Sequence, residues 1–561
     1  MDKACLRPIE RDLAQAVMTG RELACGELDP ALLAVTGDQQ RIIRAEVIRD
    51  ILVGRHVKNP GPHGLRLTHA RITGSLDLDR LTPIMGLALS SCVLDHPIAM
   101  RGCHLPWLTL SGSHLPGIVA DGVLVDGAAE FIGTRVSADS DSAAVGVSGA
   151  YIRGVFDCSG ARVINKSGPA LVADNLKVDG SLDFARLEAE ANCGSGAVQL
   201  VRALVGGSMR GDFAVLVNKA GPSFSGDNLR VSGPFSLSQS KCLGNHPLLG
   251  VVGLHGADTG NVEFDGATVI NESGSALVAT RLRADGTVSF RDGFHAAGRD
   301  RPTLDLDAAQ IAGGLDFAGS RLLNRDGLAL NLASATVKWI CLPDDAICRS
   351  GPEDDGTLRL DGFTYSALDP RGADLGRWLT WLRSSTPAYT TQPYQQLAAL
   401  YRAAGNEVAA RRVLIAQQDD LLTRGELGGH WAKAWHRLKK LAVGYGYQSW
   451  RALIGLIIVV ILGAALGLMA GHIRVGPGRF GAVHSVATGH SGTPCSTVEQ
   501  IGLGLDLSLP AINTGLSNSC SLDSASRAGQ VITVIAWIFQ GIGWALATLV
   551  IAGYTGLIRK V

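Results

Sequence analysis

The sequence lacks several features that would assign it to a function class. It has no net charge, with 51 Lys and Arg residues against 51 Asp and Glu residues, which removes the broad electrostatic reason to expect a nucleic-acid partner. The first twelve residues are charged and contain no apolar run of signal-peptide length. The 11 cysteines lack the dense spacing of a secreted disulfide scaffold. We therefore expect no nucleic-acid partner and a solenoid region that stays in the reducing cytosol.

Motifs for catalysis and cofactor binding are also missing. Gly194-Ser-Gly196 lacks the third glycine of a dinucleotide-binding loop and opens no helix, and no Cys-x-x-Cys redox pair occurs. Two cysteines and two histidines between residues 92 and 104 are chemically suited to zinc, but their spacing matches no tight zinc template. We predict no catalytic residue, no metal site and no cofactor, and we lean against an enzyme.

Glycine, in contrast, is abundant at 70 residues, and much of it is periodic. A short apolar phrase centred on glycine recurs at alternating intervals of 26 and 27 residues, and Gly74 extends its phase toward the N-terminus. A set of asparagines keeps a second phase with a constant spacing of 53 residues. The glycines are Gly127, Gly154, Gly180, Gly207, Gly233, Gly260, Gly286 and Gly313, and the asparagines are Asn165, Asn218, Asn271 and Asn324.

The residues between these glycines predict short strands. Apolar residues alternate with period 2 in segments such as Leu182-Asp-Phe184, which are too short for helices. We predict a mainly β fold, a parallel β-solenoid (β-helix) of about 11 coils over residues 59–369, in which Leu182 and Phe184 point inward. Residues 1–58 are predicted to form a helical cap, with an apolar face made by Ile42, Ile43, Val47, Ile48 and Ile51.

After residue 370 the apolar period becomes that of a helix. We predict a helical connector over residues 370–450 and a transmembrane two-helix hairpin over residues 451–561, because Ala452–Gly471 and Gln530–Ile558 carry no charge and are long enough to span a bilayer. Small residues on the two helices predict that they pack closely together. These are Gly463, Gly467 and Gly471 on the first helix and Gly541, Ala545, Thr548, Ala552 and Gly556 on the second.

The basic residues at the ends of the hairpin predict its orientation. They place the N-terminus and the C-terminus in the cytoplasm, the protein in the inner membrane as a multi-pass protein, and residues 472–529 in an outside loop. That loop holds Cys495 and Cys520, which we predict to form a disulfide on the oxidising face. The basic residues are Lys433, Arg437, Lys439, Lys440, Arg451, Arg559 and Lys560.

A row of mostly acidic residues is the candidate binding feature. Its members stand three positions after the periodic glycines, where a side chain points outward from its strand, so we expect one row along the solenoid. The row reads as a groove for a cation, a basic peptide or a sugar, or alternatively as a solvated face whose charges discourage aggregation. Its acidic members are Asp77, Glu130, Asp157, Asp183, Glu263 and Asp316, interrupted by Arg210, Ser236 and Ser289.

The C-terminal third also carries phrases that resemble a known family. They are Pro393-Tyr-Gln-Gln-Leu-Ala398, Ala410-Arg-Arg-Val-Leu-Ile-Ala416, Gly444-Tyr-Gly-Tyr447, Leu505-Asp-Leu-Ser-Leu-Pro510 and Gly543-Trp-Ala-Leu-Ala-Thr548. In these phrases the chain resembles a family of uncharacterised actinobacterial membrane proteins with two spans, often labelled "membrane-associated oxidoreductase". Ser449 and Gly504 depart from the family pattern, which usually has Pro and Ser there.

Three functions are consistent with these observations. The first is a membrane-anchored scaffold whose solenoid binds a cytoplasmic protein partner while the hairpin contacts the lipid bilayer. The second is the oxidoreductase that the resemblance implies. The third is a signalling protein that senses the envelope through the outside loop. No oligomeric state is predicted.

Overall fold

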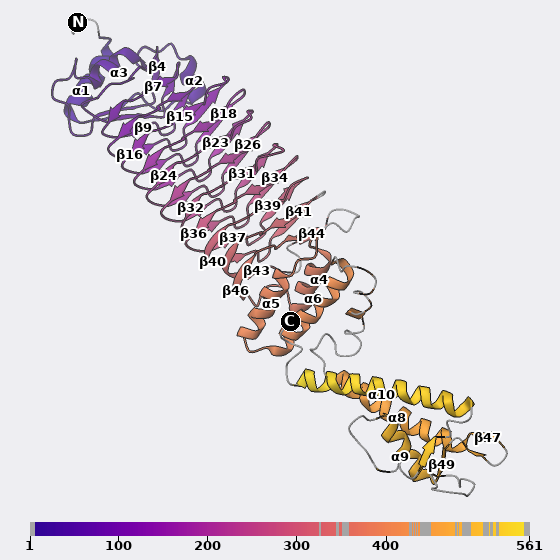
Figure 1. Cartoon of the computed structure of the whole chain (residues 1–561). Coiled ribbons are helices and arrows are strands. Elements are labelled where there is room, and N and C mark those ends of the chain that lie inside the picture. The colour runs from indigo at the N-terminus through magenta and orange to yellow at the C-terminus, as the bar shows by residue number, and fades with distance from the viewer. Residues whose placement is uncertain are drawn as a thin grey trace. The chain divides into compact units, whose positions relative to one another are not determined.

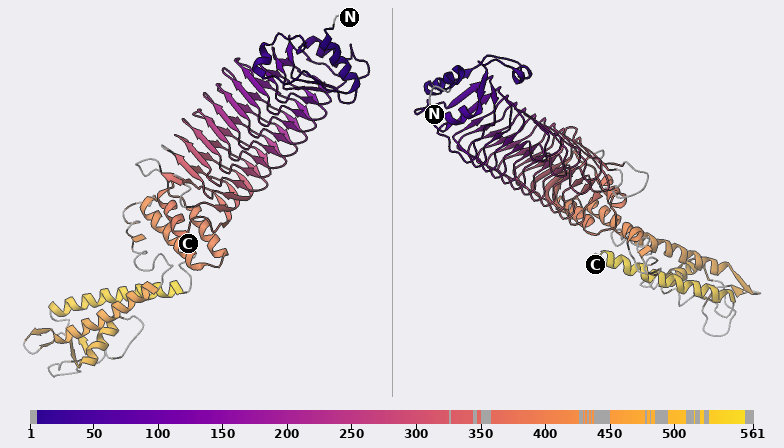
Figure 2. Two further views of the ribbon diagram at one scale, coloured as in Figure 1. Left: turned by 180° about the vertical axis from the view of Figure 1, so that it is seen from behind. Right: turned by 90° about the horizontal axis from the view of Figure 1, so that it is seen from above.

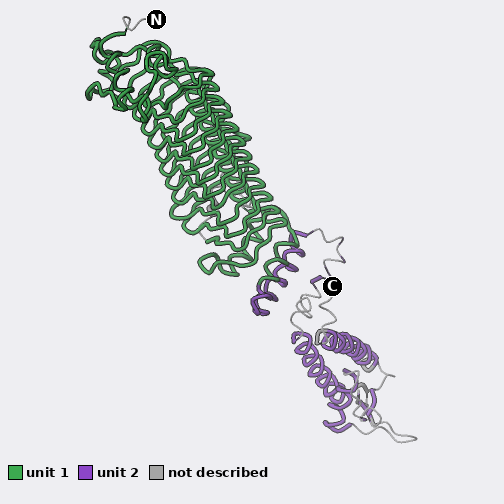
Figure 3. Tube along the Cα trace, turned by 90° about the vertical axis from the view of Figure 1, so that its left-hand side faces the viewer, with its two compact units in different colours: residues 1–400 green, residues 401–561 purple. Residues whose placement is uncertain are grey.

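In the computed structural model the chain forms a parallel β-solenoid of about 12 turns followed by helices, which confirms the predicted fold class (Figure 1). The structure describes residues 6–324, 327–343, 347–349, 358–425, 450–476, 479–480, 482–484, 495–508, 520–522 and 527–554, with single residues at 429, 431, 434, 436, 437 and 515. The chain divides into two compact units, residues 1–400 and 401–561 (Figure 3).

Most coils contribute four short strands to three parallel sheets, which we call sheets A, B and C, and in the last coils the two strands of sheet A are joined into one, as in β40 (Gln310–Asp316). In one coil, β16 (Tyr151–Ile152) and β17 (Phe156–Asp157) belong to sheet A, β18 (Arg162–Asn165) to sheet B and β19 (Leu171–Val172) to sheet C. Every strand pairs in parallel with the corresponding strand of the next coil, and Figure 2 shows the resulting stack. Sheet A has two strands per coil because the periodic glycine stands between them.

The periodic glycines form a column that requires the absence of a side chain. The amide of Gly154 donates to the carbonyl of Gly127 at 3.0 Å, and the amide of Gly180 donates to that of Gly154 at 3.1 Å. A Cβ atom on Gly154 would lie 2.6 Å from the carbonyl carbon of Gly127. The repeat therefore keeps glycine because adjacent coils approach closely here.

The core between the sheets is filled by the inward-pointing residues of each strand. Leu182, Phe184, Leu315 and Phe317 are all buried, as expected from their alternation. Buried phenylalanine rings of successive coils stack, as Phe290 does on Phe317 with ring centroids 5.1 Å apart.

The first coils are shorter than the later ones, and this overturns the assignment of Gly74. In sheet A, Leu87 pairs with Leu108 and Leu108 pairs with Ala129, steps of 21 residues, whereas Ala129 pairs with Phe156, a step of 27 residues. Gly74 lies directly after β4 (Arg71–Thr73) of sheet B, so it is not part of the glycine column in sheet A. Its 53-residue distance from Gly127 spans about two and a half short coils.

The longer coils owe their extra residues to one loop between sheets B and C. In a short coil, only Pro116 and Gly117 separate β10 (His114–Leu115) from β11 (Ile118–Val119). In the next coil, residues 139–144 separate β14 (Arg135–Ala138) from β15 (Val145–Gly146). A comparable loop recurs in every longer coil that the structure describes through β42 (Leu330–Asn331).

The periodic asparagines hold these loops in pairs. The amide nitrogen of Asn271 donates to the carbonyl of Ser275 in its own coil at 2.8 Å and to that of His246 in the preceding coil at 3.0 Å. Its oxygen accepts from the amides of Ser273 and His246, one in each coil. Asn165, Asn218 and Asn324 make equivalent bonds. One buried side chain therefore serves two coils, which explains the 53-residue period.

The N-terminal cap contains helices and strands. Its helices are α1 (Pro8–Thr19), α2 (Pro30–Val35) and α3 (Ala45–Leu52), and Val47, Ile48 and Ile51 of α3 are buried. Ile42 and Ile43, however, lie in strand β2 (Ile42–Arg44), which pairs with β4 and extends sheet B. The expectation of a single helical face was wrong because these two β-branched residues complete an open sheet edge.

Two helices follow the last coils of the solenoid. The indole of Trp378, in α4 (Leu375–Ser384), stacks on Tyr365 with ring centroids 6.0 Å apart. From α5 (Gln392–Ala403), the side chains of Gln392 and Gln396 donate to the carbonyls of Phe363 and Tyr365 in the last strand, β46 (Thr364–Leu368), and in the turn before it. These contacts satisfy carbonyl groups at the end of the stack.

The second unit contains α6 (Glu407–Arg424), α8 (Trp450–His472), α9 (Thr497–Ser508) and α10 (Arg527–Tyr554). Two of its segments, Trp450–His472 and Gln530–Ala552, are long and apolar enough to cross a membrane. Helix α8 contacts both α9 and α10.

The glycines of α8 do not pack as the sequence predicts. Gly463, Gly467 and Gly471 face α9, whereas Gly541 of α10 has no atom close to the position of a Cβ. Ala545 and Thr548 of α10 are exposed, and Gly556 lies outside the described residues. The expected packing of the two small-residue faces was wrong because α9 occupies the glycine face of α8.

Asn271→Ala is predicted to loosen two loops at once. It removes the partner of the amide and carbonyl of His246 and of the amide of Ser273, whereas the carbonyl of Ser275 keeps its bond from the amide of Val251, and we expect a cost of about 2 kcal/mol. Hydrogen exchange of the full-length chain in detergent, read by mass spectrometry, should show amides in both loops exchanging about 30-fold faster. The control is Asn245→Ala, which removes an exposed asparagine bonded to the hydroxyl of Ser273. Equal exchange in the two variants would contradict the shared role of Asn271.

Candidate functional site

The structure brings five of the six predicted acidic residues into one column of sheet A. Glu130 pairs with Asp157 and Asp157 pairs with Asp183, each at the end of the second strand of its coil. The column continues through Arg210, Ser236, Glu263, Ser289 and Asp316. Asp77 does not belong to it, because Asp77 bridges Ala99 of β7 (Ile98–Ala99) in line with sheet C.

Basic and hydroxyl side chains neutralise or bind much of this row. Arg210 forms an ion pair with Asp183 on the adjacent strand. Asp316 is buried, and its carboxylate lies 3.0 Å from the guanidinium of Arg371. Glu130 accepts a hydrogen bond from Thr109 at 3.1 Å. Besides the interruptions at Arg210, Ser236 and Ser289, these contacts therefore reduce the negative charge that the row exposes.

In the turn two residues after the second strand of sheet A, several coils carry a polar side chain, namely Ser159, Asp212, Ser238, Asp265 and Arg291. Burial acts to raise the pKa of Asp265, but hydrogen bonds from Arg291 and Ser289 hold that pKa below its usual value. Burial, together with the carboxylates of Asp265 and Asp212, raises the pKa of Glu263. Glu263 and Asp265, two residues apart in one coil, thus have pKa values shifted in opposite directions.

An open hollow of about 530 Å³ lies over this part of the solenoid. Within it, the carboxylate of Asp157 forms no ion pair among the described residues, although the positive charge of Arg210 acts on it, and it accepts a hydrogen bond from the backbone amide of Ser159 at 2.8 Å. Exposed apolar side chains of Phe213 and Ile132 stand beside the charged groups. The hollow is lined by Ile132, Gly133, Asp157, Ser159, Gly160, Asp183, Ala185, Arg186, Arg210, Asp212 and Phe213.

Phe213 is the residue of this hollow that sequence reasoning missed. Its side chain is 57% exposed and its backbone has φ +61°, the left-handed region that costs a bulky residue about 1 kcal/mol or more. Corresponding turn positions hold Gly133, Gly160, Gly266 and Gly319, which adopt this φ without strain, and Arg186, Gln239 and Asp292, which share the left-handed φ but are not aromatic. Phe213 combines a strained backbone with an exposed aromatic ring inside a hollow, which makes it a candidate contact residue.

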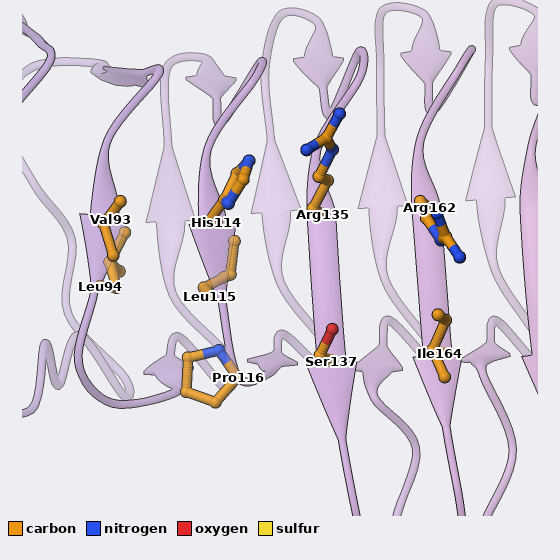
Figure 4. A pocket seen from close by; sticks show the side chains of 9 residues that line it. All are labelled: Val93, Leu94, His114, Leu115, Pro116, Arg135, Ser137, Arg162 and Ile164. Carbon is orange, nitrogen blue, oxygen red and sulfur yellow. The ribbon is translucent and has the colours of Figure 1, made fainter. Parts of the chain in front are cut away.

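A second hollow, of about 540 Å³, lies on the outer face of sheet B where short coils meet long ones (Figure 4). His114, Arg135 and Arg162 stand side by side on adjacent strands, above Leu115 and other apolar residues. Burial and the charge of Arg135 lower the pKa of His114, which is therefore neutral at pH 7. Two guanidinium groups and an imidazole suit a small anion such as a carboxylate or phosphate.

The two cysteines predicted to pair are joined by a disulfide in the structure, between Cys495 and Cys520. Both are buried in a small cluster with Leu503 and Ile532. Thiols in the solenoid are different in character. Burial raises the pKa of Cys92 to about 12, and Cys103 and Cys341 are shifted in the same way, so these groups are protonated rather than nucleophilic.

Comparisons with other proteins assign no function to the site. No family model, no curated protein and no solved structure matches the chain. Within the described ranges, no three His, Cys, Asp or Glu side chains are grouped so that they could hold a metal ion.

The backbone strain at Phe213 predicts that a glycine variant is more stable than an alanine variant at this position. Phe213→Ala and Phe213→Gly both remove the ring, but only glycine adopts φ +61° freely. We expect Phe213→Gly to be more stable locally than Phe213→Ala by about 1 kcal/mol. Amides of residues 211–216 should then exchange about fivefold more slowly in the glycine variant. Equal or faster exchange in the glycine variant would show that the position carries no backbone strain.

Proposed function

We propose that this protein is a membrane-anchored binding module, in which the solenoid binds a cytoplasmic protein partner and helices α8 and α10 fix it to the bilayer. The observation that carries the proposal is the combination of a solenoid bearing an open, mixed apolar and charged hollow with two long apolar helices. Binding by such a surface needs no catalytic group.

Exposed apolar surface supports the membrane part of the proposal. Large apolar side chains project from both helices, including Ile457, Ile461, Trp537 and Ile551, each at least half exposed. Contiguous apolar surface of this extent on a protein needs an apolar environment, and a bilayer provides it along a helix of this length.

The orientation rests on charge and on the disulfide. Arg451 lies in the first turn of α8, and a cytoplasmic position for the basic residues at the ends of the hairpin places both termini inside. Lys433, Lys439, Lys440, Arg559 and Lys560, which also support this orientation, lie outside the described residues. The Cys495–Cys520 disulfide then falls on the opposite, oxidising face.

The hollow on sheet A favours a basic peptide segment of a protein partner over a bare cation or a sugar. Phe213 and Ile132 offer apolar contact area, and the carboxylate of Asp157 is available to a Lys or Arg side chain. The ion pair of Asp183 with Arg210 forms a polar rim next to them. Protein interfaces have this pattern of an aromatic centre with charged surroundings.

The oxidoreductase and sensing activities have less support. The family membership and the oxidoreductase activity that it implies remain a prediction. The described thiols of the solenoid that are buried have raised pKa values, which disfavours thiol redox chemistry at those positions.

Partner capture tests the binding part of the proposal. Full-length protein in detergent, immobilised and exposed to cytosol of its own host, should retain a protein that Asp157→Arg and Phe213→Gly each reduce at least tenfold, because each removes a central contact. Glu190→Arg is the matched control, since Glu190 lies on sheet B and pairs with Lys219. A retained protein whose capture is unchanged in both hollow variants would exclude this hollow as its binding site.

A further inference from the structure

Helix α9 runs alongside α8 at a separation that requires glycine on both helices. A Cβ on Gly467 would lie 2.1 Å from the carbonyl oxygen of Gln500, and a Cβ on Gly504 would lie 2.3 Å from that of Gly463. Gly471 faces Gln500 and Gly463 faces Ser508, so the two helices are antiparallel. This is the close backbone packing that small residues give to helices in membranes.

The position of α9 along α8 fixes its depth. Helix α8 has 23 residues and spans about 34 Å, little more than the roughly 30 Å of a bilayer core. A helix that lies beside residues 463–471 therefore lies within the same apolar layer as those residues. Eight residues separate Gly471 from Gly463, so Ser508 lies about 12 Å deeper than Gln500.

The composition of α9 changes along its length in the same direction. Its outer end is polar and capped, with the amide of Ser496 donating to the carboxylate of Glu499 at 2.8 Å. From Ile501 onward, Asp506 is the only ionisable residue of the helix. The hydroxyl of Ser508 donates to the carbonyl of Gly504 at 2.9 Å, so its polar group is satisfied within the helix.

The two faces of α9 are also distinct. Leu503 and Leu507 pack with Leu466 of α8 in the cluster around the disulfide. Gln500 is buried; its nitrogen donates to the carbonyl of Cys495, and its side-chain oxygen has no hydrogen-bond partner within the described residues. Ile501 and Leu505 are partly exposed apolar side chains on the remaining face.

We propose that α9 is a re-entrant helix, which enters the bilayer from the face bearing the disulfide and returns to that face before α10. Acyl chains of that leaflet cover Ile501 and Leu505, and the carboxyl group of Asp506 is carried into the hydrocarbon core. The inference rests on the membrane spans proposed above for α8 and α10.

Thiol labelling of intact cells or right-side-out vesicles tests this proposal. Val498→Cys places a thiol at the exposed outer end of α9, and Leu505→Cys places one two turns further along. A membrane-impermeant maleimide should label Val498→Cys and spare Leu505→Cys, while both should react after denaturation. The wild-type chain is the control for its own cysteines.

The remaining outcomes separate the two proposals. Labelling of both thiols would show an outside helix in water and overturn the re-entrant helix, while the proposed orientation stands. Labelling of neither before denaturation would overturn the proposed orientation itself. A nitroxide on Leu505→Cys in liposomes should also collide more often with oxygen than with a water-soluble nickel chelate; rare collisions with both would mean burial in protein and would overturn the lipid contact.

Discussion

The sharing of one asparagine amide between two coils is the interaction on which the solenoid depends. Loops between sheets B and C expose backbone amides and carbonyls, and buried polar groups need partners. Asn165, Asn218, Asn271 and Asn324 supply those partners for their own coil and for the coil before it. The paired positions in the alternate coils hold the small residues Ala138, Ala191, Gly244 and Gly298. A Cβ on Gly244 would lie 2.7 Å from the carbonyl oxygen of Gly221.

This constraint helps to fix the register of the longer coils, and that register creates the site. With the coils aligned, residues at one position of the repeat stand beside each other about 4.8 Å apart, whatever their side chains are. Asp157, Asp183 and Arg210 therefore become neighbours, although 26 or 27 residues separate them in sequence. The hollow forms where this column meets Phe213, at a turn position with left-handed φ that holds glycine in four other coils and Arg186, Gln239 or Asp292 in three.

Sequence periodicity predicted the fold correctly at positions where the structure requires the same residue type in successive coils. The glycines and the asparagines of these columns recur at regular intervals in the sequence, and both sets stack in the structure as their spacing predicts. The prediction failed for Gly74 and Asp77 because the first coils lack the loop that sets the 26/27-residue period. Phe213 was missed because the exposure of its side chain and its backbone φ cannot be predicted from the periodicity of the sequence. The partner of the α8 glycines was misassigned because a small-residue face shows that a helix packs closely, without showing which helix it meets.

Membrane anchorage with the solenoid on the cytoplasmic side is the central claim. The proposed cytoplasmic partner, the location of the disulfide on the oxidising face and the depth of α9 in the bilayer all depend on it. Protease treatment of right-side-out and inside-out membrane vesicles tests it most directly. Added protease should leave the solenoid intact in right-side-out vesicles and should cleave it from the membrane in inside-out vesicles. Cleavage of the solenoid from sealed right-side-out vesicles, or its release from the membrane by alkaline carbonate without protease, would contradict the account.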